Sequence, residues 1–140
     1  MFLNSLNISG SGMTAQRLRM DIISQNLANE DTTNAANGQP YRRKEAVLQE
    51  TTQTMYPGTG STQGPGGVEV AAIKEDASPF KLEYDPSSAN ANASGYVELP
   101  NVDTTTEMVD LMSSSRSYEA DVTAFNAMKG MATTALDIGK

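Results

Sequence analysis

The residues that could do chemistry in this 140-residue chain are mostly carboxylates, because the sequence contains neither histidine nor cysteine. A Ser–His–Asp triad, a Cys–His pair and a cysteine metal site are therefore excluded. Two pairs of adjacent carboxylates remain, Glu30-Asp31 and Glu75-Asp76. Neighbouring side chains in a strand or turn point apart, and no EF-hand pattern surrounds either pair. The sequence favours solvated surface over catalysis or calcium binding at both places, and no pattern predicts a cofactor.

Two further stretches carry groups that could bind a ligand. The glycine-rich stretch 58–67 (GTGSTQGPGG) lacks the Gly-Lys-Ser/Thr that completes a phosphate-binding loop, so the sequence predicts a flexible loop there. Arg42-Arg43-Lys44 is the one basic run of an acidic chain. Two interpretations of this run stay open. It is either an ion-pairing patch for carboxylates of another subunit, or a solvated strand edge whose charges prevent unwanted strand pairing.

The length of 140 residues suits one modest domain, and the composition limits its core and its partners. The formal net charge is −7 and the pI about 4.4, which disfavours a general nucleic-acid binder with its basic face. Apolar residues make up 38% of the chain, against ~45–50% in ordinary domains, so we expect a small core. No run approaches the ~18 apolar residues of a membrane span, and the first residues lack the regions of a secretory signal. We expect neither membrane insertion nor a cleaved signal peptide.

A first helix is predicted from the N-terminus to about Asn29. Its apolar residues recur every seven positions in two rows, which are Leu6, Met13, Met20 and Leu27 (the first row) and Ile8, Ala15 and Ile22 (the second row). Two such rows on one helix can face two neighbours. Gly10 and Gly12 each cost about 1 kcal/mol relative to alanine inside a helix, so we expect a bend there or a start near Ser11.

A longer helix is predicted near the C-terminus. Thr104 suits the N-cap of a capping box in which Glu107 reaches back, with Asp103 as the alternative cap, and Gly139 suits the position just past the helix. The expected seam contains Met108, Leu111, Ser115, Tyr118, Val122, Phe125, Lys129, Ala132 and Leu136. This spacing favours a hairpin of the two terminal helices within the chain, and packing between subunits remains the alternative.

The middle of the chain differs from both ends, because it is rich in glycine, proline, serine, threonine and asparagine. Short strands are predicted at 46–49, 68–73, 80–84 and 96–99, with a loop at 87–94. The expected fold class is mainly α with a small β element. Its terminal helices (1–30 and 102–140) form a coiled-coil-like discontinuous domain around a loop-rich β segment (31–101).

Uncharged amides are concentrated where the first helix ends. Asn26 lies in its last turn and Asn29 at or just past its end, where asparagine tolerates the left-handed backbone that commonly ends helices. Thr32 and Thr33 can then fix a turn through local hydrogen bonds. The stretch is either a well-specified helix stop or, in addition, a place where neutral amides satisfy backbone groups at a tight subunit contact.

Three segments resemble the bacterial flagellar rod and hook axial protein family. They are SQNLANEDTT after the first helix, NGQPYRRKEAVLQE, and SGYVELPNVDTTTEMVDLMSSSRSYEADVTAFNAMKGMATTALDIGK near the C-terminus, and they occur in the order of the family. The resemblance implies a structural subunit of the proximal rod and not an enzyme. It implies that the terminal helices pack as a layer around the export channel, while the central segment contacts neighbouring subunits.

The resemblance also implies partners and a location. The partners are other rod subunits, further copies of the chain and the flagellar type III export apparatus. The location is the basal-body rod, which crosses the periplasm and transmits torque, reached without a cleaved signal peptide. We expect three sets of site residues. The assembly seams are Leu6, Met13, Met20, Leu27, Met108, Leu111, Tyr118, Val122, Phe125 and Leu136; the helix stop is Asn26, Asn29, Thr32 and Thr33; and the intersubunit contact is Tyr41, Arg42 and Arg43.

Two other functions stay open at this point. One is an adaptor that binds another axial protein without forming a continuous layer. The other is a carboxylate-dependent hydrolase of cell-wall glycans, which would need two carboxyl groups ~5–9.5 Å apart in a cleft.

Overall fold

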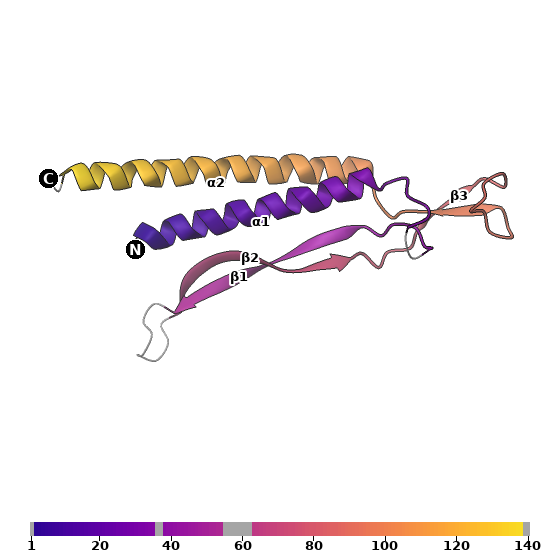
Figure 1. The fold of residues 1–140 in the computed structure, drawn as a ribbon, viewed down its shortest axis with the longest axis horizontal. Helices are drawn as coiled ribbons and strands as arrows, with labels where there is room; N and C mark the ends of the chain where they lie inside the picture. The colour runs from indigo at the N-terminus through magenta and orange to yellow at the C-terminus, as the bar shows by residue number, and fades with distance from the viewer. Residues whose placement is uncertain (1, 36–37, 55–62, 139–140) are drawn as a thin grey trace.

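The computed structural model describes residues 2–35, 38–54 and 63–138 and contains two long helices and two β-hairpins. The elements are α1 (Phe2–Ala28), β1 (Lys44–Thr54), β2 (Gln63–Glu75), β3 (Lys81–Tyr84), β4 (Tyr96–Leu99) and α2 (Thr104–Ile138). The helices lie antiparallel, and the β1–β2 hairpin runs along α1 on its other side (Figure 1). The expected fold class is confirmed. Neither helix in the described ranges has a stretch apolar enough to cross a membrane.

Helix α1 runs without interruption through both glycines, so the expectation of a bend or a start near Ser11 is wrong. Contacts with α2 on one side and with β2 on the other stabilise the helix beyond its intrinsic propensity. Gly12 has a packing role, because an added Cβ there would lie 2.9 Å from Oδ2 of Asp121 on α2. Glycine thus leaves room for the carboxylate of Asp121 against α1.

The first turn of α2 differs from the predicted capping box. Asp103, the alternative, is the N-cap: its Oδ1 accepts a hydrogen bond from the backbone N–H of Thr106 at 3.0 Å. Thr104 is the first helical residue, and its hydroxyl donates to the carboxylate of Glu30. Glu107 does not reach back to the N-cap, because its side chain is buried and bonded to two other elements.

We expect the first turn of α2 to lose stability in acid. The bond from Thr106 is the main cause that lowers the pKa of Asp103 below its ordinary value of 3.8. A carboxylate with a lower pKa in the folded state stabilises that state above the unfolded pKa, and the contribution disappears as the pH falls. Asp103→Asn should reduce this acid sensitivity, since asparagine also caps helices and does not titrate. Protection of the Thr106 amide from hydrogen exchange, compared at neutral pH and at about pH 3, measures the effect. An equal loss of protection in the parent and in Asp103→Asn would contradict it.

The four predicted strands all exist. β1 and β2 pair antiparallel from Lys44↔Glu75 to Thr54↔Gln63, with irregularities after Val47 and after Thr51. β2 begins inside the stretch 58–67, so the prediction of a loop is wrong for 63–67, while 58–62 lies outside the described residues, as does the predicted cap at Gly139.

The start of β2 is ordered by α1. Gly67 has a φ of +115°, and an added Cβ would collide with the Ser11 side chain. The Ser11 hydroxyl accepts a hydrogen bond from the backbone N–H of Val68 at 3.0 Å and donates to the carbonyl of Ile8. Packing against a helix thus gives this glycine-rich stretch a defined strand conformation.

The second hairpin and the core are small. β3 and β4 pair from Lys81↔Leu99 to Tyr84↔Tyr96, and the connection between them contains the predicted loop 87–94. The core of the described chain consists of the buried apolar side chains of Ala15, Ile22, Ile23, Val97 and Val102. Most of them belong to α1, where it is covered by α2 and by the first hairpin.

Candidate functional site

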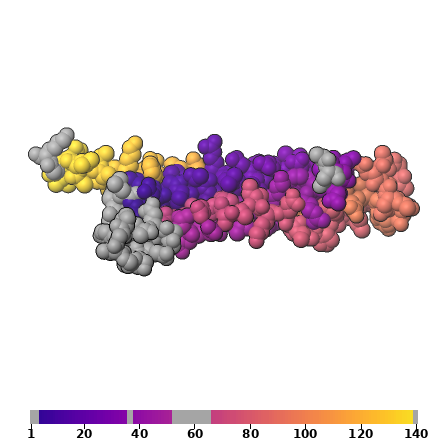
Figure 2. Space-filling view, turned by 60° about the horizontal axis from the view of Figure 1, so that its bottom comes forward, coloured from indigo at the N-terminus to yellow at the C-terminus, as the bar shows by residue number. Residues whose placement is uncertain are grey.

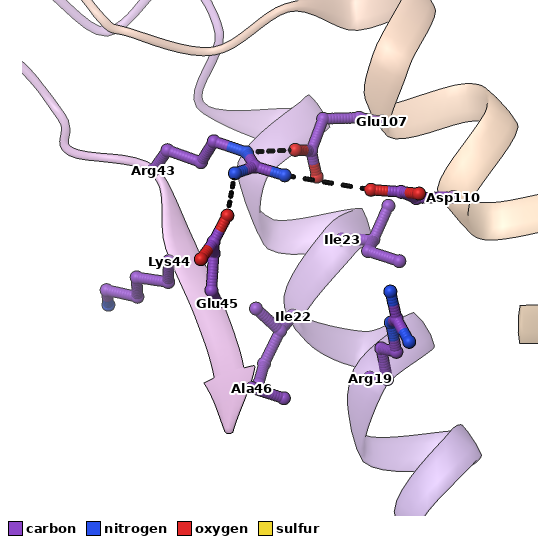
Figure 3. A pocket seen from close by; sticks show the side chains of 9 residues that line it. All are labelled: Arg19, Ile22, Ile23, Arg43, Lys44, Glu45, Ala46, Glu107 and Asp110. Carbon is purple, nitrogen blue, oxygen red and sulfur yellow. Dashed lines mark hydrogen bonds and ion pairs between the residues drawn. The ribbon is translucent and has the colours of Figure 1, made fainter. Parts of the chain in front are cut away.

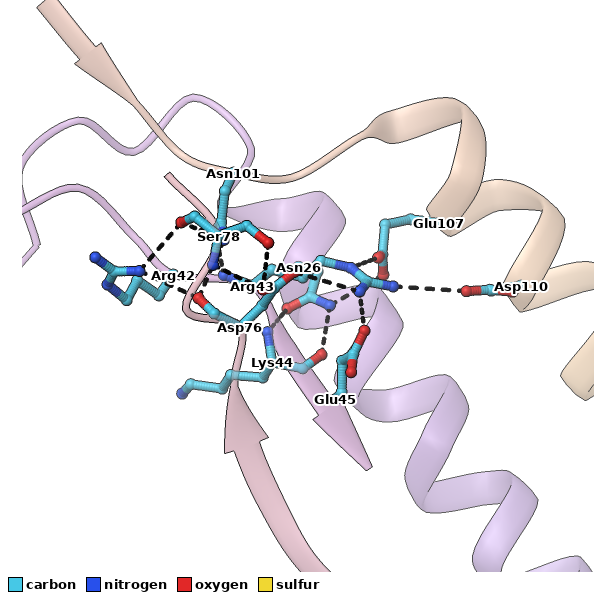
Figure 4. Close-up of polar contacts among 10 residues, drawn as sticks. All are labelled: Asn26, Arg42, Arg43, Lys44, Glu45, Asp76, Ser78, Asn101, Glu107 and Asp110. Carbon is cyan, nitrogen blue, oxygen red and sulfur yellow. Dashed lines mark hydrogen bonds and ion pairs between the residues drawn. The ribbon is translucent and has the colours of Figure 1, made fainter. Parts of the chain in front are cut away.

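A buried polar group joins α1, β1 and α2 at one end of the helix pair. We call it the junction cluster and define it as Asn26, Tyr41, Arg43, Glu107 and the backbone of Lys44. Asn26 comes from the last turn of α1 and Glu107 from the first turn of α2. The segment entering β1 lies beside them and bonds to both (Figure 4).

Asn26 is fully buried, and its amide makes every hydrogen bond that an amide can make. Its Nδ2 donates to the carbonyl of Lys44 at 2.9 Å and to Oε2 of Glu107 at 3.0 Å. Its Oδ1 accepts from the N–H of Lys44 at 2.9 Å and from the hydroxyl of Tyr41 at 2.9 Å. The side chain therefore binds β1 as a neighbouring strand would, through one donor and one acceptor of the same residue.

Glu107 is also fully buried, and Arg43 supplies its counter-charge. Nε of Arg43 lies 2.5 Å from Oε1 of Glu107, and its NH1 group bonds the carboxylate of Glu45. Burial by itself lowers the pKa of Arg43, but the hydrogen bond and charge of Glu107, followed by Glu45, outweigh it and raise that pKa. Burial, followed by the charge of Glu107, raises the pKa of Tyr41. The cluster therefore holds a charged guanidinium and a protonated phenol, and both donate.

A second asparagine holds the same segment from the other side. Oδ1 of Asn101 accepts from the N–H of Arg43 at 2.9 Å, and its Nδ2 donates to the carbonyl of Asp76 at 3.1 Å. The N–H of Asp76 returns to the carbonyl of Arg43 at 2.8 Å. Hydrogen bonds from Ser78 lower the pKa of Asp76. The entry into β1 is thus hydrogen-bonded on both sides.

A cavity of about 170 Å³ adjoins the cluster (Figure 3). It is lined by Arg19, Ile22, Ile23, Arg43, Lys44, Glu45, Ala46, Glu107 and Asp110. Three of these residues are carboxylates, and all three lie within 4 Å of the Arg43 guanidinium. Across the described ranges no group of three potential ligand side chains could hold a metal ion. The arrangement joins three elements structurally and offers no pair of carboxyl groups free of Arg43 for acid–base work.

The structure brings together three of the expected site residues, Asn26, Tyr41 and Arg43. We expected Tyr41 and Arg43 to meet a neighbouring subunit, but their polar atoms bond to Asn26 and Glu107 of the same chain. The reason is the buried amide and carboxylate, which need partners. Arg42 points elsewhere: its guanidinium lies 4.3 Å from the centre of the Phe80 ring and donates to backbone carbonyls. A contact between subunits through these residues stays a prediction.

The expected helix stop lies beside the cluster. α1 ends at Ala28, and Nδ2 of Asn29 donates back to the carbonyl of Gln25 at 2.8 Å. The hydroxyl of Thr32 donates to Oδ1 of Asn29 at 3.3 Å, and that of Thr33 accepts from Asn90 at 3.1 Å. These side chains hold the turn that carries the chain from α1 toward β1.

The ten expected seam residues share one property, because each of them keeps part of its surface exposed. They are Leu6, Met13, Met20, Leu27, Met108, Leu111, Tyr118, Val122, Phe125 and Leu136. Met108 is 53% exposed and Leu136 is 71% exposed. On α1 the chain instead buries the second row at Ala15 and Ile22. The role of the seam residues between subunits stays a prediction.

Two residues of this site, Glu107 and Asn101, are not predicted by the sequence. Glu107 was assigned to a capping box, although a carboxylate on the inward face of a helix also indicates a buried partner. Asn101 carried no pattern that could have indicated its contacts with Arg43 and Asp76. Both residues bind groups that are far away in the sequence.

Comparison with known proteins identifies the family. Residues 6–35 match a family model described as "Flagella basal body rod protein", and residues 93–138 match "Flagellar basal body rod FlgEFG protein C-terminal". The chain is 54% identical to the flagellar basal-body rod protein FlgC of Bacillus subtilis, over 98% of this chain and 97% of that protein. It is 43% identical to FlgC of Salmonella typhimurium (99% and 98% covered) and 43% identical to FlgC of Borreliella burgdorferi (96% and 95% covered). The chain with this junction therefore belongs to the FlgC family of flagellar basal-body rod proteins.

Proposed function

We propose that this structural subunit of the flagellar basal-body rod joins its neighbours through the first row of α1, Leu6, Met13, Met20 and Leu27. The observation that carries the proposal is the different burial of the two rows. Two of the three members of the second row, Ala15 and Ile22, are buried within the chain and Ile8 is partly exposed, whereas every member of the first row is left partly exposed. Full burial of an exposed methionine or leucine side chain gains about 1.5–3 kcal/mol, and each of these four would gain a fraction of this because it is already partly covered in the single chain. Together the four still favour association with apolar helices of other subunits.

The direction of the first row supports this assignment. Successive residues of a helix are about 100° apart, so Met13 points roughly 160° away from Ser11, and Met20 points equally far from Ile22. Ser11 bonds β2, and Ile22 lines the junction cavity beside β1. The hairpin therefore covers the opposite side of α1, and the first row is free to meet helices of other subunits.

The unequal lengths of the helices leave a second apolar surface. α1 has 27 residues and α2 has 35, so the C-terminal end of α2 projects past the start of α1 (Figure 2). Met131, Leu136 and Ile138 near this end are 57%, 71% and 81% exposed. Neighbouring rod subunits would cover this part of α2 as well.

The finer assignments follow from the family resemblance. We propose that the chain occupies the proximal rod, helps to enclose the export channel and transmits torque without catalysing a reaction. It reaches this place across the periplasm through the type III export apparatus, without cleavage of a signal peptide. The engagement of the cavity carboxylates with Arg43 supports the structural role over the glycan hydrolase.

We expect Met13→Asp to fold as a monomer but to fail in rod assembly. The side chain of Met13 is partly exposed in the single chain, so the charge can stay in water there, whereas assembly would bury it without a counter-ion. Basal bodies purified from cells that express the variant should lack the subunit, while circular dichroism of the monomer stays unchanged.

Thr14→Asp is the matched control, because Thr14 is the next residue, is exposed and points about 100° away. It should support assembly and motility. Incorporation of both variants at the level of the parent would contradict the interface, whereas the family assignment would remain.

A further inference from the structure

Two of the positions through which the helices face each other do little to fix how far one helix is shifted along the other. Gly12 lies against Asp121, and Asn26 lies against Glu107, two heptads further along both helices. Halfway between these pairs, α2 presents a small buried serine, Ser114. The small residues Gly12 and Ser114 leave few side chains that interlock, so packing at these two positions favours no single register, whereas the buried contact of Asn26 with Glu107 can specify one.

The apolar rows do not fix the register either. Both rows of α1 repeat every seven residues, so a shift by one heptad, about 10 Å, places apolar residues where apolar residues were. Such a shift preserves the apolar pattern of the two rows, although Gln16 would take the place of the buried Ile23. A polar interaction must therefore distinguish the two registers, as single buried polar residues do in coiled coils.

Arg19 provides a competing partner for Glu107. It lies one heptad before Asn26 on α1, and it lines the same cavity as Glu107 and Asp110. Figure 3 shows its side chain on the α1 side of that cavity. Within the described residues Arg19 has no ion pair or hydrogen bond, so its charge is available. A shift by one heptad would bring Glu107 opposite Arg19.

We propose that Asn26 and Arg43 select the register of α2 against α1 by holding Glu107, and that the competing register pairs Glu107 with Arg19. In the observed register the carboxylate has two partners, the amide of Asn26 and the guanidinium of Arg43. In the shifted register it has Arg19 alone. Since α1 and β1 are joined through Asn26 and Lys44, they shift together against α2. The proposal concerns the single chain and stands apart from rod assembly.

Disulfide cross-linking tests this proposal, because the native chain contains no cysteine. Gly12→Cys with Asp121→Cys reports the observed register, since a Cβ at Gly12 would lie 3.4 Å from Cγ of Asp121. Ser5→Cys with Asp121→Cys reports the register shifted by one heptad. Each pair is placed in the parent, in Arg43→Met and in Arg43→Met combined with Arg19→Met, and the rates of oxidation are compared in the purified full-length chain.

In the parent, the 12–121 bond should form at least about ten times faster than the 5–121 bond. Arg43→Met should lower the ratio of the 12–121 rate to the 5–121 rate at least about tenfold. Adding Arg19→Met should bring this ratio most of the way back to the parental value. Arg17→Met, a change at an exposed arginine on the same helix, should leave the ratio unchanged.

Three results would overturn the proposal. The first is that the 12–121 and 5–121 disulfides form in Arg43→Met with the same ratio of rates as in the parent, which would show that Arg43 does not select the register. The second is that the ratio of rates falls equally in Arg43→Met and in Arg43→Met combined with Arg19→Met. This would indicate that the helices have loosened and have not adopted a second register. The third is loss of the helical circular dichroism signal in Arg43→Met, because the shifted register would keep Glu107 paired and the chain folded.

Discussion

Asn26→Asp is expected to lower the free energy of unfolding by about 3–5 kcal/mol, although the two side chains have nearly the same shape. The amide of Asn26 donates to the carbonyl of Lys44 and to Glu107, and a carboxylate can donate to neither when ionised. It would also place a second negative charge beside a buried one. Since a domain is stable by only about 5–15 kcal/mol, the loss is a large part of the total. Denaturant unfolding of the purified chain measures it.

Asn29→Asp is the matched control, because it makes the same change three residues later, outside the buried cluster. The Asn29 side chain donates only one hydrogen bond, to the carbonyl of Gln25, and keeps access to solvent, so the loss should stay below about 1 kcal/mol; a carboxylate can still accept the bond from Thr32. The deficit of Asn26→Asp should shrink in acid, where protonation removes the added charge. Equal losses for both variants would mean that the hydrogen bonds of Asn26 are worth no more than those at an exposed helix end.

The elements of the fold could be predicted because their causes are local. Heptad rows and the composition of the middle segment predicted both helices and all four strands. The two glycine predictions differ from the structure for related physical reasons. Helix propensity describes an isolated helix, whereas Gly12 lies against Asp121 of α2, and the composition that predicts a loop at 58–67 does not include the packing of Gly67 against Ser11. At both positions the absence of a side chain allows close packing, which outweighs the local cost.

The junction cluster could not be predicted because its bonds join residues that are distant in sequence. The sequence identified Asn26 as a residue that could satisfy backbone groups without adding charge, and the structure shows such bonds to Lys44 within the chain. It could not indicate that this amide also faces a buried Glu107. The local pattern of Glu107 suits a capping box equally well, and only the packing of three elements decides between the two roles.

The two apolar rows of α1 show a second limit of sequence analysis. Their spacing indicates that the helix has two apolar sides, but spacing is the same for a contact within the chain and for one between subunits. The structure buries Ala15 and Ile22 of the second row and leaves the first row partly exposed. This difference gives the first row its proposed role in assembly.

Glu107→Lys should have the other large effect and lower the free energy of unfolding by at least about 3–5 kcal/mol. It replaces the counter-ion of Arg43 by a like charge at a fully buried position, and it removes the acceptor of Asn26. The shifted register offers no relief, because Arg19 would repel the new lysine. Denaturant unfolding and the helical circular dichroism signal should both show a chain that is largely unfolded at physiological temperature.

Glu119→Lys is the control, since it makes the same change at an exposed position of α2 and should alter stability by less than about 0.5 kcal/mol. Combining Glu107→Lys with Arg43→Glu restores opposite charges. The double variant should nevertheless regain less than half of the free energy of unfolding that Glu107→Lys loses. The reason is that Nδ2 of Asn26 would then face another donor and Glu45 would face a carboxylate. Full recovery by the charge exchange would show that attraction between two charges suffices. Partial recovery would show that the hydrogen-bonding direction of Asn26 determines which of the two positions carries the carboxylate.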